Sequence, residues 1–513
     1  MPLENNSNSL DEIIEVNGDN INLDNFIKIA RFNHKVKLSN DAKIRIKTCR
    51  EVVDKLVDED QVVYGLTTGF GSLYDVKINK DQTEQLQENL LISHACSVGD
   101  ALSEEIVRGI MLLRINTFAK GYSGIRLSTV EKIIEMLNKQ VYAYVPKKGS
   151  VGSSGDLSPL SHLFLPLIGE GEIFIDGKLM PAREVFKKLD IETIKLSSKE
   201  GLALNNGTPV MTSIGAIAVY DAKNLLAHSL LATSLTYEAL RGNSSPLNDK
   251  VNQARPHKGQ LTCARILKDI LKGSQLVDSN KPKVQDAYSL RASSVVIGAS
   301  LDAINYIESK LLIEMNSATD NPLIIDGKAI SAANFHGQPM ALALDFLAIA
   351  ISELGNISDR RIFRMIDSNL NEGLPPFLIT SSGLSNGFMI PQYTTAALVS
   401  ENKVLAHPAS VDSIPTCANQ EDHVSMGAIS ANKALEILEN TVNIIGIELM
   451  VASQAIELRE KEPSAISKQA VQSIRKKIAH LDIDRVLYKD INIIADMVRN
   501  RDILKDLDYE IKI

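Results

Sequence analysis

This chain of 513 residues has few cysteines, and its positively charged residues are fewer than its negatively charged ones. No Cys-x-x-Cys pair occurs, so the sequence offers neither a zinc knuckle nor a disulfide framework. The 55 lysines and arginines are outnumbered by 63 aspartates and glutamates, which gives a net charge of −8. We therefore expect no nucleic-acid partner and no binding to a membrane surface. The four cysteines are far apart, at Cys49, Cys96, Cys263 and Cys417.

Segments that could cross or enter a membrane are also missing from the sequence. The most apolar run, around residues 444–455, is interrupted by Glu448, and a spanning helix needs about 20 apolar residues. The first 16 residues are polar and acidic, without the basic and apolar regions of a signal peptide. These features predict a cytoplasmic protein, where unpaired cysteines stay reduced.

The spacing of apolar residues predicts long helices. With 44% hydrophobic and 23% charged residues, the composition is that of a globular protein. The chain is also long enough to form more than one domain. Some helical stretches, such as residues 341–351, are apolar on more than one side, which indicates burial in a bundle or against other subunits. Helical spacing recurs over residues 82–118, 210–240, 292–315, 340–366 and 424–458.

Strand signals are few. Residues 13–16 read as a strand before an Asn-Gly-Asp turn and a helix, and residues 172–175 before Asp176-Gly177 read as half of a hairpin. We predict a mainly α protein with two parts. A loop-rich N-terminal part would span residues 1–210, and a bundle of long helices with a C-terminal helical part would span residues 211–513.

The most unusual stretch reads Gly-Ser-Val-Gly-Ser-Ser-Gly-Asp over residues 149–156. Taken alone, it is typical of a turn that leads into a helix. It matches neither a P-loop nor the Gly-x-Ser-x-Gly of hydrolases. A rarer chemistry does fit, because Gly155 lacks a Cβ and its nitrogen can approach the Ser153 carbonyl carbon to close a five-membered ring. Loss of water from that ring and of the Ser154 hydroxyl would leave a conjugated alkene, which is an electrophile.

Here the sequence resembles the aromatic amino acid ammonia-lyases, which form the prosthetic group 4-methylidene-imidazol-5-one (MIO) from their own backbone. Their usual triad is Ala-Ser-Gly, whereas this chain has Ser153-Ser154-Gly155. Only the backbone carbonyl of the first residue is needed, so we expect the ring to form with a hydroxymethyl substituent. The resemblance extends over about residues 64–426. It implies a mainly α fold and a homotetramer whose active sites combine loops of several subunits.

Residues 64–71 read Tyr-Gly-Leu-Thr-Thr-Gly-Phe-Gly, which alone could be a glycine turn with a packed aromatic side chain. The family has a similar string, with Asn in place of Thr67, and its catalytic tyrosine matches Tyr64. The resemblance implies that Tyr64 removes the β-proton of the substrate. A phenol with a pKa of about 10 would need nearby positive charge or hydrogen bonds to act at neutral pH.

Two positions bear on the substrate. Ser93-His94 is similar to the pair at which histidine-specific members of the family differ from the phenylalanine and tyrosine enzymes. Glu421, in a Gln-Glu-Asp-His string, matches a glutamate of the same members, and a carboxylate can accept a hydrogen bond from an imidazole N–H. Without the resemblance, His94 would be a structural group and Glu421 part of a solvated turn. The histidines lack the spacing of zincins, so we expect no metal.

The resemblance assigns roles to six further residues. A guanidinium matches a carboxylate geometrically, so Arg291 is expected to bind the substrate carboxylate, although it could simply be an ion-pair partner. Gln285 and the catalytic residue Tyr288 would line the same pocket. Asp156, Asn206 and Phe335 are expected to support the MIO ring, with Asn206 also binding substrate.

The resemblance at these residues implies the elimination of ammonia from L-histidine to give trans-urocanate. A tyrosine or phenylalanine ammonia-lyase, or an MIO aminomutase that returns the amine to the β-carbon, is the alternative within the family. A helical scaffold that has lost catalysis is the alternative outside it, and the unusual Ser153 is the feature that points there.

Overall fold

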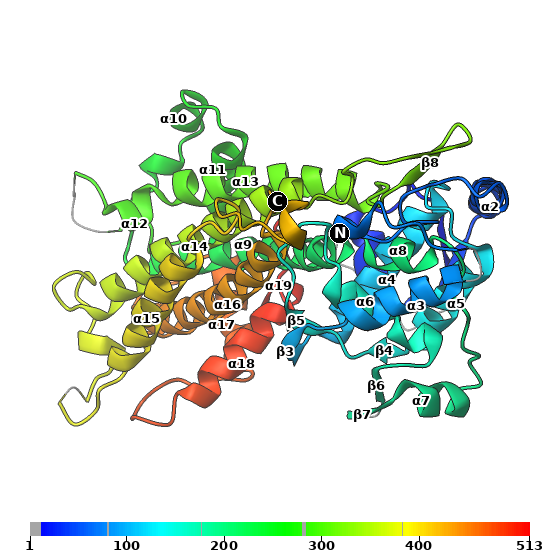
Figure 1. The fold of residues 1–513 in the computed structure, drawn as a ribbon. Coiled ribbons are helices and arrows are strands. Elements are labelled where there is room, and N and C mark those ends of the chain that lie inside the picture. Colours follow the sequence, from blue (N-terminus) through cyan, green and yellow to red (C-terminus); the bar gives the residue numbers. More distant parts are fainter. Residues whose placement is uncertain (1–11, 80–81, 176, 280–283, 382) are drawn as a thin grey trace. The chain divides into compact units, whose positions relative to one another are not determined.

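The computed structural model describes residues 12–79, 82–175, 177–279, 284–381 and 383–513 (Figure 1). The chain forms two compact units, each assembled from segments distant in sequence. The first comprises Met1–Ile217, Glu308–Asp345 and Pro408–Asn432; the second comprises Ala218–Ile307, Phe346–His407 and Lys433–Ile513. The sequence-based division after residue 210 stays a prediction.

Four long helices contribute residues to both units. They match four of the five predicted helical stretches closely, so the mainly α prediction is confirmed. Many of their positions are buried on several sides, as expected for helices with little amphipathic character. The helices are α9 (Pro209–Ala239), α13 (Ser293–Met315), α14 (Gln338–Ile366) and α16 (Gly427–Glu457).

The first unit is organised around α4 (Glu104–Ala119), whose residues from Ile106 onward are all buried. Helix α1 (Leu23–Ala30) packs against α4 through an apolar face that includes Phe26 and Ile27. The Asn22 side chain caps α1 by accepting a hydrogen bond from the Asn25 N–H. Helices α2 (Asn40–Asp58) and α5 (Leu127–Asn138) also contact α4, and β1 (Ile14–Val16) pairs in parallel with β2 (Val36–Leu38).

The prediction of one helix over residues 82–118 is wrong. The chain instead forms α3 (Thr83–His94), then β3 (Val98–Ala101), and only then α4. The break coincides with a change of backbone, because Gly99 has a φ of +93° and β3 pairs antiparallel with the distant β5 (Pro146–Lys148). This arrangement places His94 at the end of a helix.

Short helices and ribbons complete the first unit. Helices α3, α6 (Ser158–Phe164) and α8 (Glu200–Asn205) pack on one another. The predicted hairpin is present as β6 (Glu172–Ile175) and β7 (Lys178–Pro181), with β4 (Tyr142–Ala143) on its other side; Asp176 of its turn lies outside the described residues. Helix α7 (Ala182–Lys188) follows, and β8 (Leu323–Ile325) pairs with β9 (Lys328–Ile330).

The second unit has a charged group at its centre. Glu448 of α16, which interrupts the apolar run noted above, accepts hydrogen bonds from Arg361 at 2.5 and 2.7 Å. Thr236 and Ser358 donate to the same carboxylate at 2.8 and 2.6 Å. The Arg361 and Glu448 side chains are fully buried, so this network satisfies the carboxylate and ties α9, α14 and α16 together.

Among the described residues, α14 is the one helix that is long and apolar enough to cross a membrane by length and composition, but 72% of its most apolar window is buried in the structure. Core helices of folded proteins share that property.

The remaining helices of the second unit are shorter. The shorter helices are α10 (Asp249–Gln253), α11 (Lys258–Ile270), α12 (Tyr288–Arg291), α15 (Met389–Leu405), α17 (Ala465–Arg475), α18 (Tyr488–Arg499) and α19 (Asp502–Lys505).

Candidate active site

The Ser153-Ser154-Gly155 loop is pressed against the backbone of Gly207. Gly155 has a φ of +77°, and a side chain there would overlap the Gly207 carbonyl group. The Asp156 N–H donates to that carbonyl oxygen at 2.6 Å. Glycine is therefore required at position 155 for space as well as for conformation.

The other end of the loop is fixed by the segment that follows the Gln-Glu-Asp-His string. The Ser425 hydroxyl donates to the Gly152 carbonyl oxygen at 2.9 Å, and the Met426 N–H donates to the Val151 carbonyl oxygen at 2.8 Å. The Ser150 hydroxyl reaches across the loop to the Gly155 carbonyl oxygen at 3.2 Å. The loop is thus held at both ends, as a backbone cyclisation requires.

We expect Gly155→Ala to prevent cyclisation and to destabilise the loop, because the added methyl group meets backbone that cannot move aside. The positive φ alone costs about 1 kcal/mol. Intact mass should show no loss of water, and the thermal midpoint should fall. Gly327→Ala is the matched control, since Gly327 has a φ of +74° with nothing within 4 Å of an added Cβ. Loss of two waters in Gly155→Ala would contradict the requirement for glycine.

Asp156 connects the loop to α9. Its carboxylate accepts hydrogen bonds from the Val210 N–H at 2.6 Å and from the Met211 N–H at 3.4 Å. Amides in the first turn of a helix have no partner within the helix, so Asp156 caps α9 although it lies about 50 residues earlier in the chain. Burial raises the pKa of Asp156 to about 8, although these hydrogen bonds and the positive charge of Arg114 act in the opposite direction.

Asn206 lies next to Ser154. Its side-chain amide donates to the Ser154 carbonyl oxygen at 3.0 Å. Its own Oδ1 is buried without a hydrogen-bond partner among the described residues. The structure thus places Asn206 where it can polarise the carbonyl of the central loop residue.

A cavity of about 650 Å³ opens in front of the loop. This volume suits an amino acid with an aromatic side chain. It is lined by residues of the first unit, and six of them are site residues predicted from the sequence. These are Tyr64, Ser153, Ser154, Asn206, Phe335 and Glu421.

Glu421 faces Ser154 in this cavity. The Ser154 hydroxyl donates to Oε1 of Glu421 at 2.7 Å, and the Thr416 hydroxyl donates to Oε2 at 2.7 Å. Both oxygens of the carboxylate are therefore held. The group that the resemblance assigns to substrate binding lies beside the residue expected to become the electrophile.

Tyr64 lines the same cavity, and its hydroxyl oxygen accepts a hydrogen bond from the Gly71 N–H at 3.1 Å. Burial raises the pKa of Tyr64, while the Gly71 hydrogen bond lowers it and the negative charge of Glu421 raises it further. A base that acts at neutral pH would need surroundings that lower this pKa. The surroundings within this chain raise it instead.

His94 ends α3 and is half-buried. Burial lowers the pKa of His94, with the Leu90 carbonyl and the Glu421 carboxylate acting against that effect. The charge of Glu421 therefore acts on the pKa of His94, although His94 is not among the residues that line the cavity. A neutral imidazole in this position could donate or accept a hydrogen bond.

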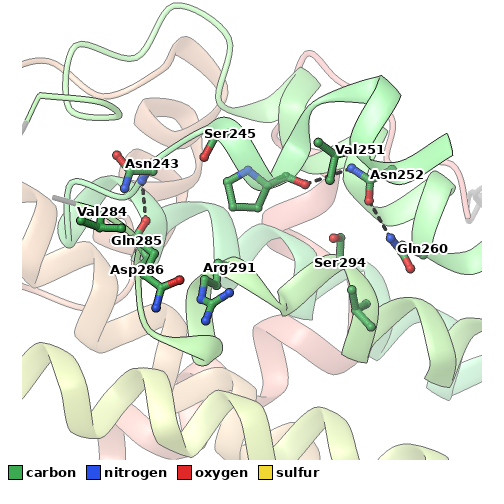
Figure 2. Close-up of a pocket in the computed structure, with 12 residues that line it drawn as sticks. Asn243, Ser245, Val251, Asn252, Gln260, Val284, Gln285, Asp286, Arg291 and Ser294 are labelled. Carbon is green, nitrogen blue, oxygen red and sulfur yellow. Dashed lines mark hydrogen bonds between the residues drawn. The ribbon is translucent and has the colours of Figure 1, made fainter. Parts of the chain in front are cut away.

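Gln285, Tyr288 and Arg291 belong to the second unit. Gln285 and Arg291 line a cavity of about 400 Å³ there (Figure 2). The Arg291 guanidinium lies 4.5 Å from the centre of the Tyr288 ring, and the Arg291 Nε is buried without a partner among the described residues. Tyr288 is 73% exposed. The three expected carboxylate-binding residues thus lie together, and the Arg291 Nε–H is a donor without a partner among the described residues.

Three residues of the first unit were missed by sequence reasoning. Thr416 and Ser425 flank the Gln-Glu-Asp-His string, and their closeness to it was the available signal. Arg114 is fully buried, and its guanidinium contacts the Ala203 carbonyl oxygen, just before Asn206. Its local sequence gave no sign of this contact, because an isolated arginine is most often exposed to solvent.

Comparison with known proteins identifies the family of this chain. The family model described as aromatic amino acid lyase matches residues 21–476. Histidine ammonia-lyase of Alkaliphilus oremlandii is 53% identical over 504 residues, which cover 98% of this chain and 99% of that protein. The chain belongs to the aromatic amino acid lyase family.

Solved structures with the same fold include two kinds of enzyme. Histidine ammonia-lyase from Trypanosoma cruzi has a TM-score of 0.90 at 41% identity, covering 96% of this chain and 95% of that one. Tyrosine aminomutase from Streptomyces globisporus has a TM-score of 0.93 at 34% identity, covering 98% of this chain and all of the other. The fold is therefore shared by lyases and aminomutases.

Proposed function

We propose that this protein is a histidine ammonia-lyase, which removes ammonia from L-histidine without oxidation and yields trans-urocanate. The observation that carries the proposal is the Glu421 carboxylate beside Ser154 in a cavity that also holds Tyr64. A carboxylate in this position can accept a hydrogen bond from an imidazole N–H, which phenyl and phenol rings do not offer at the same place. The high identity to proteins named histidine ammonia-lyase supports the same substrate.

The loop fits the prosthetic group that the family implies. Ser153, Ser154 and Gly155 would form the MIO ring, since the space at Gly155 admits no side chain and the Asn206 amide donates to the Ser154 carbonyl oxygen. Asp156, which binds the first amides of α9, and Phe335, which lines the cavity, would support the loop. The ring supplies an electrophilic alkene that converts the substrate amine into a better leaving group.

The chain's own residues bind the substrate and move its proton. Tyr64 accepts the β-proton, and Glu421 with His94 orients the imidazole. Loss of the Ser154 hydroxyl during ring formation would free Oε1 of Glu421 for this purpose. Arg291 pairs with the substrate carboxylate through its fork of N–H donors, assisted by Gln285 and Tyr288. Fixing both ends of the substrate places its β-carbon for proton removal.

The location of Gln285, Tyr288 and Arg291 in the second unit suits a homotetramer whose active sites combine loops of several subunits. We propose that assembly, and a cytoplasmic location in which the four cysteines remain free as they are in the structure. Size-exclusion chromatography with light scattering would measure the number of subunits directly.

An aminomutase is the second candidate, because two of the proteins with the same fold are named as tyrosine and phenylalanine aminomutases. They are 34% and 31% identical to this chain, well below the 53% of the histidine enzyme. Such an enzyme would convert an α-amino acid to its β-isomer. A tyrosine or phenylalanine ammonia-lyase is the other alternative, and it would leave the Glu421 carboxylate without an imidazole to bind.

Separate incubations with L-histidine, L-tyrosine and L-phenylalanine test the proposal. We expect near-ultraviolet absorbance to rise with L-histidine alone, together with release of one ammonia per urocanate. A rise only with tyrosine or phenylalanine would overturn the substrate assignment. A β-amino acid, separated from its α-isomer by chromatography and formed without ammonia release, would identify an aminomutase.

A further inference from the structure

Helix α6 packs against α3, the helix that ends at His94 (Figure 1). Two side chains of α6, Ser158 and His162, lie one turn apart and bind the backbone that follows His94. The Cys96 N–H donates to Oγ of Ser158 at 3.2 Å, and the Ser97 N–H donates to Nε2 of His162 at 3.1 Å. Two consecutive amides just beyond α3 are therefore held by one face of α6.

These contacts are connected to His94 through the backbone. The Cys96 N–H, which binds Ser158, also donates to the His94 carbonyl oxygen at 2.9 Å. The hydroxyl oxygens of Ser97 and Ser158 lie 2.7 Å apart, and both residues are buried. The turn between α3 and β3 is thus fixed to α6, and the position of the His94 side chain depends on that attachment.

The same turn contacts the beginning of the loop that carries Ser154. Gly149 has a φ of +143°, and a side chain there would lie 3.0 Å from both Cα and Oγ of Ser97. Helix α6 begins at Ser158, shortly after the loop ends. Ser97 therefore lies between the start of the loop and the helix that follows it, so the fold aligns the loop and His94 at one place.

His162 contributes a hydrogen-bond acceptor to this arrangement. Its Nε2 accepts the Ser97 N–H, so the ring is neutral and carries its proton on Nδ1. Burial lowers the pKa of His162, which favours the neutral form. The Tyr144 ring packs edge-on against it, with 6.4 Å between the ring centres. His162 is not among the residues that line the cavity, so any effect on the reaction passes through the residues that it holds.

We propose that His162 is a positioning residue for the substrate imidazole, which acts by accepting the Ser97 N–H and thereby fixing His94 at the end of α3. This inference rests on the proposed function, in which His94 and Glu421 orient the imidazole of L-histidine. Without the acceptor, a buried amide loses its partner, and the turn regains one only by moving. Such a movement shifts His94 and leaves Glu421 where it is.

The test is kcat/KM for L-histidine in full-length variants of His162. His162→Leu fills similar space without an acceptor, and kcat/KM should fall about tenfold, the scale of one lost hydrogen bond. His162→Gln is the matched control, because its amide oxygen can accept where Nε2 does, and it should recover most of that loss. Both variants should still lose two waters by intact mass, since Ser425 and Met426 continue to hold the loop.

A double-mutant cycle with His94→Gln distinguishes positioning from a general effect on the fold. If His162 acts through His94, His162→Leu should lower kcat/KM only about twofold or less once His94 is replaced. An equal fall in both backgrounds would overturn the inference. An unchanged kcat/KM in His162→Leu would overturn it as well.

The outcomes also separate this inference from the proposed function. A wild-type enzyme that does not convert L-histidine would overturn the proposed function, and this inference with it. Normal wild-type turnover with no effect of His162→Leu would overturn only the positioning role. If His162→Leu fails to fold by circular dichroism, His162→Asn decides, since its shorter amide does not reach the Ser97 N–H. A lower kcat/KM in His162→Asn supports the role, and a wild-type value overturns it.

Discussion

Ser154→Ala is expected to abolish turnover while leaving the fold intact. The variant has no hydroxyl to lose, so it cannot form the alkene of the MIO ring. Enzymes typically accelerate their reactions by about a millionfold or more, and much of that gain depends here on the electrophile, so activity should fall by at least about a thousandfold. Ammonia release measures the activity, and intact mass should show that the second water is retained.

Ser153→Ala is the matched control for this prediction. Ser153 contributes only its backbone carbonyl to the ring, and alanine at this place matches the triad usual in the family. The variant should lose both waters and keep its activity. Turnover by Ser154→Ala near the wild-type level would exclude Ser154 as the source of the electrophile. Full mass in Ser153→Ala would instead show that the Ser153 hydroxyl takes part in cyclisation.

The long helices could be predicted from the sequence because helical periodicity is local. Residues 210–240 and 340–366 carry apolar side chains at helical spacing without an internal break, and the structure has α9 and α14 there. The stretch 82–118 shows where this reasoning fails. Its apolar periodicity continues on both sides of Gly99, yet pairing between β3 and β5 interrupts the helix. That pairing joins residues about 50 positions apart, and periodicity does not report it.

The candidate site was predictable to the extent that motifs mark it. Tyr64, Ser154 and Glu421 came from three separate strings, and the structure brings them to one cavity. Their hydrogen bonds were not predictable. Thr416 holds Glu421 through a turn of left-handed residues that include no glycine, so the usual sequence signal for such a backbone is missing.

In the homotetramer proposed above, the roles of Gln285, Tyr288 and Arg291 would depend on assembly, which the sequence of one chain does not report. Their motif indicates a carboxylate-binding set, and the structure groups them in the second unit. The environment of Tyr64 was not predictable from its motif either. Burial raises the pKa of Tyr64, and that burial comes from residues distant in the sequence.

Tyr64→Phe is expected to reduce turnover by a factor of about 10² to 10⁴, the usual contribution of a positioned base. Ring formation should be unaffected, because the Tyr64 hydroxyl accepts its hydrogen bond from the Gly71 N–H, whereas the Ser154 hydroxyl is bonded to Glu421. The variant should therefore lose both waters by intact mass and yet release ammonia slowly. Tyr122→Phe is a suitable control in the same unit. Undiminished turnover in Tyr64→Phe would remove Tyr64 as the base.

The pH profile of the wild-type enzyme gives an independent measure of the same residue. A base acts in its deprotonated form, and burial raises the pKa of the Tyr64 phenol above its ordinary value. Below that pKa, each unit of pH increases the phenolate fraction tenfold. We therefore expect kcat/KM to rise from neutral to alkaline pH, and the slope to disappear in Tyr64→Phe. A rate that is flat over this range in wild type would show that the proton goes to a group with a lower pKa. A rise that survives in Tyr64→Phe would assign the titration to another residue, and the loss of turnover would then reflect positioning.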